Sequence, residues 1–143
     1  MAVSKSPLFP LATSVVLGGL GVLHVAWGRG ATFPFASRDD LNDAVIGSAH
    51  SPSPAACYSV AALLAVGASS VASSTLGASR LARLAAGGVA TVLAARGALG
   101  LAGRTDIVSP ASTSARFRRL DRRAFSPLCL ALAVGAARSL HRR

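Results

Sequence analysis

Long uncharged stretches alternate with short polar ones along the chain, a pattern that predicts four membrane-spanning helices. The clearest is residues 55–78, which contains no charged residue and exceeds the roughly 20 residues that a helix needs to cross the hydrocarbon core of a bilayer. Residues 6–28 carry no charge apart from a histidine, and residues 84–103 contain one arginine. Residues 126–140 form the shortest stretch. The pattern predicts an all-α integral membrane four-helix bundle.

The first connection contains a second periodic signal, which predicts a short amphipathic helix on the membrane surface. Ser37 is a typical N-cap residue, and it is followed by Asp39, whose charge suits the first turn of a helix. Leu41 and Val45 lie on one apolar face, and Gly47 is placed to end the helix.

The third connection predicts another short amphipathic helix. With 100° between successive residues, Phe117, Leu120 and Phe125 share one face, and Asp121 falls in the middle of it. The opposite face carries four arginines, which we expect to contact anionic lipid head groups. These are Arg118, Arg119, Arg122 and Arg123. The segment would lie as a lid over the bundle, and Ser126 would cap the fourth span.

An even number of crossings brings the first and third connections to the same side of the membrane, and with them a set of polar side chains. His24 and Trp27 lie near the end of the first span, and Arg96 lies about 10 Å from the end of the third. An unpaired guanidinium at that depth costs several kcal/mol, so we expect Arg96 to pair with Asp121. These four residues form the candidate polar pocket, and the pair can extend to His24.

Two simpler interpretations of the same residues stay open. His24 and Trp27 also suit an interfacial belt that hydrogen-bonds to head groups. The pair of Arg96 and Asp121 also suits a staple that holds the third connection to the bundle.

Cys57 and Cys129 are expected at similar depth on the same side. Two such thiols can exchange electrons with a membrane quinone, although no Cys-x-x-Cys motif is present and buried, inert cysteines are the simpler reading. The three histidines lie in separate segments, so we expect no metal site, and we expect no cofactor. The catalytic residues, if the protein is an enzyme, stay unknown.

The composition agrees with a single transmembrane domain over residues 1–143. The chain is 52% hydrophobic and 14% charged, with a mean hydropathy of +0.53, which lies outside the ordinary soluble range. Its net charge of +10 would suit nucleic acid, but no stacking aromatics or recognised module accompany the arginines. We expect membrane lipids as partners, a second copy of the chain as a further one, and no nucleic acid.

The basic residues are divided between the two sides of the membrane. The side of the first and third connections carries eight arginines and all five aspartates, and the opposite side carries six basic residues. The purely basic second turn and tail favour cytoplasmic termini.

Three segments read together resemble a known family. They are His24–Gly28, Arg96–Gly100, and Arg116–Asp121 followed by Ser126–Cys129. In this order they resemble an uncharacterised family of small bacterial four-pass membrane proteins, catalogued as a domain of unknown function. The resemblance implies a four-helix fold and a bacterial inner membrane, but no activity. The long acidic first connection departs from the family's expected pattern.

The sequence thus predicts a role in binding a small molecule or lipid, or a structural role, at the polar pocket. The alternative function is that of a membrane thiol/quinone oxidoreductase that uses Cys57 and Cys129.

Overall fold

The computed structural model describes residues 6–77 and 79–141, and within them the regular segments are all helical. The long helices are α1 (Leu8–Gly28), α3 (Pro54–Thr75), α4 (Arg80–Leu101) and α7 (Ser126–Ser139). The predicted all-α bundle is confirmed. The largest difference from the predicted spans is at α4, which begins four residues earlier because the Ser79 side chain accepts a hydrogen bond from the Ala82 backbone and caps it.

The outward faces of these helices are apolar, as a lipid environment requires. Among the described residues, α1, α3 and α4 are each long and apolar enough to cross a membrane. Large side chains on their outer faces are freely exposed, including Val15, Leu63 and Leu84 at 72–74%. Exposed aliphatic surface on this scale is costly in water and neutral in lipid. The chain is a multi-pass membrane protein.

Helix α7 has 14 residues, fewer than the other long helices, and it packs along α4. At one end Gly97 of α4 lies against α7, since an added Cβ would come 2.7 Å from Leu130. At the other end the Arg83 guanidinium donates to the Leu140 carbonyl at 2.8 Å. On α7, the Arg138 guanidinium carbon lies 5.1 Å from the centre of the Phe9 ring of α1.

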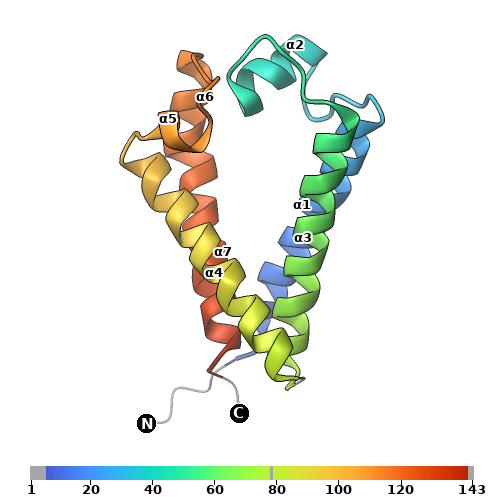
Figure 1. Ribbon diagram of the computed structural model, residues 1–143, viewed down its shortest axis with the longest axis vertical. Coiled ribbons are helices and arrows are strands. Elements are labelled where there is room, and N and C mark those ends of the chain that lie inside the picture. The colour runs from blue at the N-terminus through green and yellow to red at the C-terminus, as the bar shows by residue number, and fades with distance from the viewer. Residues whose placement is uncertain (1–5, 78, 142–143) are drawn as a thin grey trace.

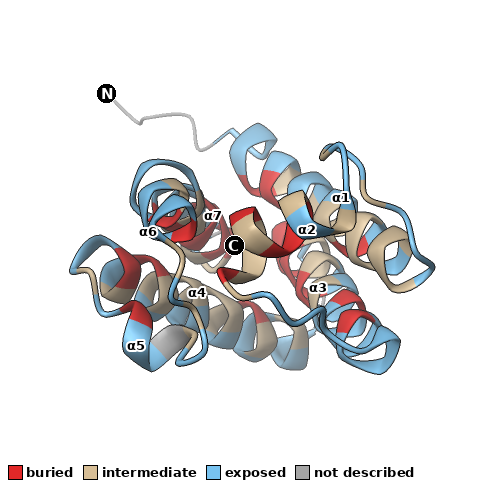
Figure 2. Ribbon diagram, turned by 90° about the horizontal axis from the view of Figure 1, so that it is seen from above, coloured by how far each residue is buried: buried red, intermediate tan, exposed pale blue. Residues whose placement is uncertain are grey.

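The long helices form two pairs arranged as a V (Figure 1). Helix α1 packs on α3, and α4 packs on α7. The pairs meet where α1 begins and α7 ends, and they diverge towards the opposite end. A core of Leu17, Val71, Ala86, Leu132 and Ala136 fills the closed end. Seen along the bundle, buried residues lie on the sides that face other helices, and the outer sides are exposed (Figure 2).

A cap formed by the first connection lies over the open end of the V (Figure 1). Helix α2 (Arg38–Leu41) continues into a π-helical turn, η1 (Asn42–Ile46). As predicted, Ser37 caps α2, since its hydroxyl accepts a hydrogen bond from the Asp40 backbone at 3.1 Å. Gly47 ends the turn in the left-handed conformation, with φ of +74°, which favours glycine.

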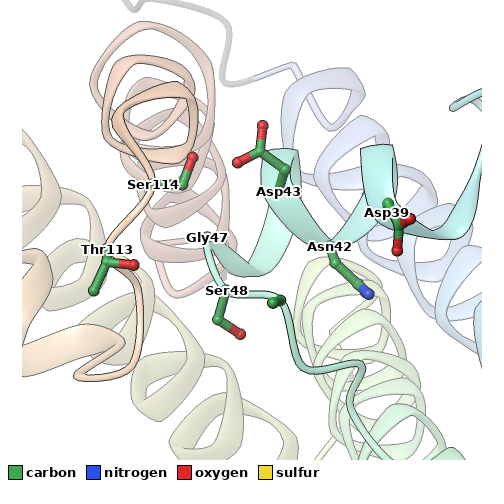
Figure 3. Close-up of a pocket in the computed structure, with 8 residues that line it drawn as sticks. Asp39, Asn42, Asp43, Gly47, Ser48, Thr113 and Ser114 are labelled. Carbon is green, nitrogen blue, oxygen red and sulfur yellow. The ribbon is translucent and has the colours of Figure 1, made fainter.

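The cap is fastened to the third connection through Gly47. The Gly47 carbonyl accepts hydrogen bonds from the backbone N–H groups of Thr113, at 2.9 Å, and Ser114, at 3.1 Å. The Arg116 guanidinium adds an ion pair to Asp40 at 2.9 Å. We call these contacts between the cap and the third connection the clasp. A pocket of about 390 Å³ lies beside the clasp, lined in part by Asp43 and Gly47 on one side and by Thr113 and Ser114 on the other (Figure 3). The two connections therefore form one lid across both helix pairs.

The third connection differs from its prediction in one respect. After α5 (Thr105–Val108), the expected amphipathic helix is present as α6 (Ala115–Leu120), but it leads through a π-helical turn, η2 (Asp121–Phe125), directly into α7. The Ser126 N–H bonds to the Asp121 carbonyl across this turn. The prediction that Ser126 caps α7 is therefore wrong, because the backbone before α7 is already helical and no side chain caps its first turn.

Candidate functional site

An ion pair fastens η2 to α4. Arg96 Nη2 lies 2.5 Å from Asp121 Oδ1, so the contact expected from the sequence is present. The Asp121 side chain has no exposed surface, and that of Arg96 is 25% exposed. Arg96 Nη1 also donates to the Ser126 hydroxyl at 3.4 Å. Because the pair spans two helices in a water-poor layer, it holds them in one register.

Gly100 allows α4 to approach this pair. A Cβ added there would come 1.9 Å from Ser126 Oγ and 2.6 Å from Asp121 Oδ2. Any larger residue at this position would push Arg96, Asp121 and Ser126, which we call the polar cluster, away from their present positions against α4. Within the described part of the chain, Asp121 Oδ2 is buried and makes no hydrogen bond, so the hydrogen bond from Arg96 reaches Asp121 through Oδ1 alone.

The two faces of the amphipathic segment lie as the periodicity predicts. Phe117 is buried, and its ring centroid lies 6.4 Å from that of Phe125. Asp121, which lies between these two residues in the sequence, is also buried. The four arginines of the other face are exposed. They line a surface pocket of about 330 Å³, and we refer to them together as the arginine patch: Arg118, Arg119, Arg122 and Arg123.

His24 and Trp27 lie side by side at the end of α1, with ring centroids 4.9 Å apart. His24 Nδ1 is 2.7 Å from the Leu20 carbonyl. A carbonyl only accepts, so Nδ1 carries the proton, and Nε2 is an acceptor in the neutral ring. Trp27 Nε1 donates to the Phe33 carbonyl at 2.8 Å. Among the described residues His24 makes no hydrogen bond to Asp121, so in this structure the ion pair does not extend to it.

An apolar cavity of about 460 Å³ lies between the two helix pairs, and we name it the inner cavity. Leu17 and Leu132, which also belong to the core, form its closed end. Its other end is polar, with His24, Trp27 and Arg96 among the lining residues. Apolar walls with a few converging polar groups, in a volume of about 300–1,000 Å³, are typical of small-molecule sites.

A smaller outer cavity, of about 260 Å³, lies between the cap and the end of the α1–α3 pair. It shares His24, Trp27, Val45 and Val60 with the inner cavity, so these side chains form the partition between the two spaces. Arg38 lines the outer cavity and not the inner one.

The cysteines are placed on different cavities. Cys57 is buried and lines the outer cavity, and Cys129 is half-buried and lines the inner one. Both are free thiols. Their use as a redox pair stays a prediction.

The three segments that carry the family resemblance meet around this site. In the first, Gly28 lies so close to α3 that an added Cβ would come 2.6 Å from the Tyr58 ring. The second and third supply the two ends of the ion pair, Arg96 and Asp121. A family model described as "Protein of unknown function (DUF3995)" matches residues 17–136.

The chain belongs to this family. No curated protein and no solved structure gives a significant match. The DUF3995 match begins within α1 and ends within α7, so it includes the inner cavity, the ion pair and the arginine patch. Because the DUF3995 description states no function, a functional proposal for this chain has to be argued from the cavity, the ion pair and the arginine patch.

Sequence reasoning missed Ser126, a member of the polar cluster, and Gly100, which lies against it. Gly100 is one of three glycines that follow Arg96 within a few residues, and a small residue near an intramembrane charge signals close packing. Ser126 was assigned to a cap because serine is common there, whereas its hydroxyl accepts a hydrogen bond from Arg96.

Proposed function

We propose that the protein binds a single-chain lipid whose head carries both a hydrogen-bond donor and an acceptor, such as a carboxylic acid. The proposal rests on the inner cavity, whose walls are mostly apolar and which has polar side chains at one end. The hydrocarbon chain lies between the helix pairs, and the head lies at His24 and Arg96. The membrane is taken as a bacterial inner membrane on the strength of the resemblance, with its cytoplasmic face where α1 begins and α7 ends.

The choice of head group follows from the two polar side chains. A guanidinium has five N–H donors and no acceptor, and Arg96 uses two of its nitrogens on Asp121 and Ser126. The remaining donors suit a carbonyl oxygen. His24 Nε2 accepts a hydrogen bond in the neutral ring, which suits a hydroxyl. A protonated carboxyl group offers both partners.

Trp27 provides the readout, since it is the single tryptophan of the chain and lines the inner cavity. We would titrate the protein, in phosphatidylcholine nanodiscs, with dibromostearic acid, whose bromines quench a tryptophan on contact. The expected result is saturable quenching. The methyl ester keeps the carbonyl but lacks the hydroxyl, and we expect it to bind about tenfold more weakly, as the loss of one hydrogen bond predicts.

A matched pair of variants on α4 separates the cavity from the lipid-facing surface. Leu93→Phe places extra volume in the inner cavity, and Leu81→Phe adds the same volume at an exposed position. We expect the first to weaken binding and the second to leave it unchanged. Quenching that rises linearly without saturation, or equal quenching in both variants, would show partitioning into bulk lipid and overturn the proposal.

A further inference from the structure

We infer that the arginine patch is a binding site for the phosphate head group of an anionic phospholipid, separate from the inner cavity. The four side chains come from α6 and η2, are exposed, and surround a surface pocket of about 330 Å³. Guanidinium groups bind phosphate oxygens through paired N–H donors, which gives geometric selectivity as well as charge attraction.

The charge balance of the third connection distinguishes these arginines from their neighbours. Arg104 pairs with Asp106 at 3.1 Å, and Arg116 pairs with Asp40 at 2.9 Å. Within residues 6–77 and 79–141, no carboxylate lies in ion-pair distance of the patch. Four adjacent guanidinium groups repel one another unless an anion lies between them, and the chain's own acids in this region are already used.

The depth of the patch identifies the anion as a lipid head group. An added Cβ on Gly103, just beyond the end of α4, would lie 2.2 Å from Arg122 Nη2, so this guanidinium is level with the end of a membrane helix. Arg119 lies three residues before Arg122, about 4–5 Å further along the helix. These positions fall in the head-group layer, which extends a few ångströms beyond the hydrocarbon core.

Exposed apolar surface for an acyl chain lies close to the patch, at the end of α4. Leu101, two residues before Gly103 on α4, is 45% exposed although it is a large aliphatic side chain. A phospholipid with its phosphate at the patch would lay its chains over this surface. A soluble phosphate or a polyanion would make no use of it.

The experiment measures the immobilised fraction of spin-labelled phosphatidylglycerol and of spin-labelled phosphatidylcholine around the full-length protein in proteoliposomes. One arginine near an anionic surface contributes about 1 kcal/mol, or roughly fivefold in association, so we expect the wild type to prefer phosphatidylglycerol by at least about fivefold. The variant with all four arginines changed to Gln should lose the preference. High salt should reduce it in the wild type.

Two further variants guard against misfolding and general charge effects. Arg119→Gln with Arg123→Gln removes two guanidinium groups that make no hydrogen bond to the described residues, so the fold is retained and the preference should fall by at least about fivefold. Arg104→Gln removes one positive charge from the same connection, outside the patch, and should leave the preference intact. An unchanged preference in the double variant, an equal loss in Arg104→Gln, or displacement of the labelled lipid by millimolar inorganic phosphate would overturn the inference.

Discussion

Exchanging Arg96 for Met would leave the Asp121 carboxylate without a counter-ion in a buried position. The atoms Arg96 Nη2 and Asp121 Oδ1 are 2.5 Å apart, and the Asp121 side chain has no exposed surface. Removing one partner of a buried ion pair costs about 3–5 kcal/mol, because the remaining charge stays desolvated. Since Asp121 has no path to solvent, we expect Arg96→Met to lower the free energy of unfolding by about 4 kcal/mol.

Asp121→Asn should cost less, about 2 kcal/mol. The Arg96 side chain keeps a quarter of its surface exposed, and the carbonyl of Asn can still accept a hydrogen bond from it. The double variant removes both charges and leaves a buried amide, for which we expect a cost of about 3 kcal/mol. The coupling between the two positions is then about 3 kcal/mol, at the upper end for residues in direct contact.

The measurement is equilibrium unfolding of the purified protein in mixed detergent micelles, followed by circular dichroism, for the wild type and the three variants. Arg104→Gln is the matched control, because Arg104 and Asp106 form an ion pair at 3.1 Å with side chains 57% and 63% exposed. Water screens an exposed pair of this kind, so we expect its loss to have little effect on stability. If Arg96→Met costs no more than the control, or if the costs of the single variants simply add, the pair does not hold α7 to α4. If Asp121→Asn costs more than Arg96→Met, the argument from burial is wrong.

Three further predictions concern other parts of the chain. Gly100→Ala should destabilise the protein by about 2–3 kcal/mol through overpacking, because the new methyl group would lie 1.9 Å from Ser126 Oγ. The control Gly88→Ala places a methyl group where no atom lies within 4 Å, and it should be neutral or slightly stabilising in the same unfolding assay. The hydrogen bond from Arg104 lowers the pKa of Asp106. The small stability that this pair adds is therefore present above the ordinary carboxyl pKa of about 3.9, and it is lost as the pH falls through the lower pKa of the folded state. Arg104→Gln should raise the titration midpoint of the Asp106 carboxyl group measured by carbon NMR, and an unshifted midpoint would contradict this assignment. Both cysteines are free thiols, so maleimide labelling of denatured protein should be the same with and without prior reductant, and an increase after reduction would instead support the thiol/quinone alternative.

The helices of the bundle were predictable because lipid imposes a simple condition on them. Every backbone group must be satisfied within the helix and most side chains must be apolar, so runs of membrane length with at most one charged residue locate α1, α3 and α4 directly. The same condition located the ion pair. A charge inside such a run, Arg96, needs a partner, and Asp121 was the acid that lay on an apolar face.

The V shape and the cap could not be predicted in this way. The clasp depends on the backbone carbonyl of Gly47, which accepts hydrogen bonds from Thr113 and Ser114, and backbone acceptors leave no pattern in the side chains. The sequence does place a glycine at the end of the short helix, and its positive φ confirms that expectation. The partner of this glycine, some 66 residues away, is set only by the packing of the two helix pairs.

The π-helical turn η2 explains why the sequence located Asp121 correctly and misassigned Ser126. In an α-helix, residues five apart are separated by about 140° around the axis, so the two side chains would face different neighbours. In a π-helical turn the N–H of one bonds to the carbonyl of the other, as Ser126 does to Asp121, and both side chains then lie one above the other. In this arrangement Arg96 contacts both. The turn therefore brings two oxygen acceptors to one guanidinium at the polar end of the inner cavity, and on its outer side it carries Arg122 and Arg123 of the arginine patch.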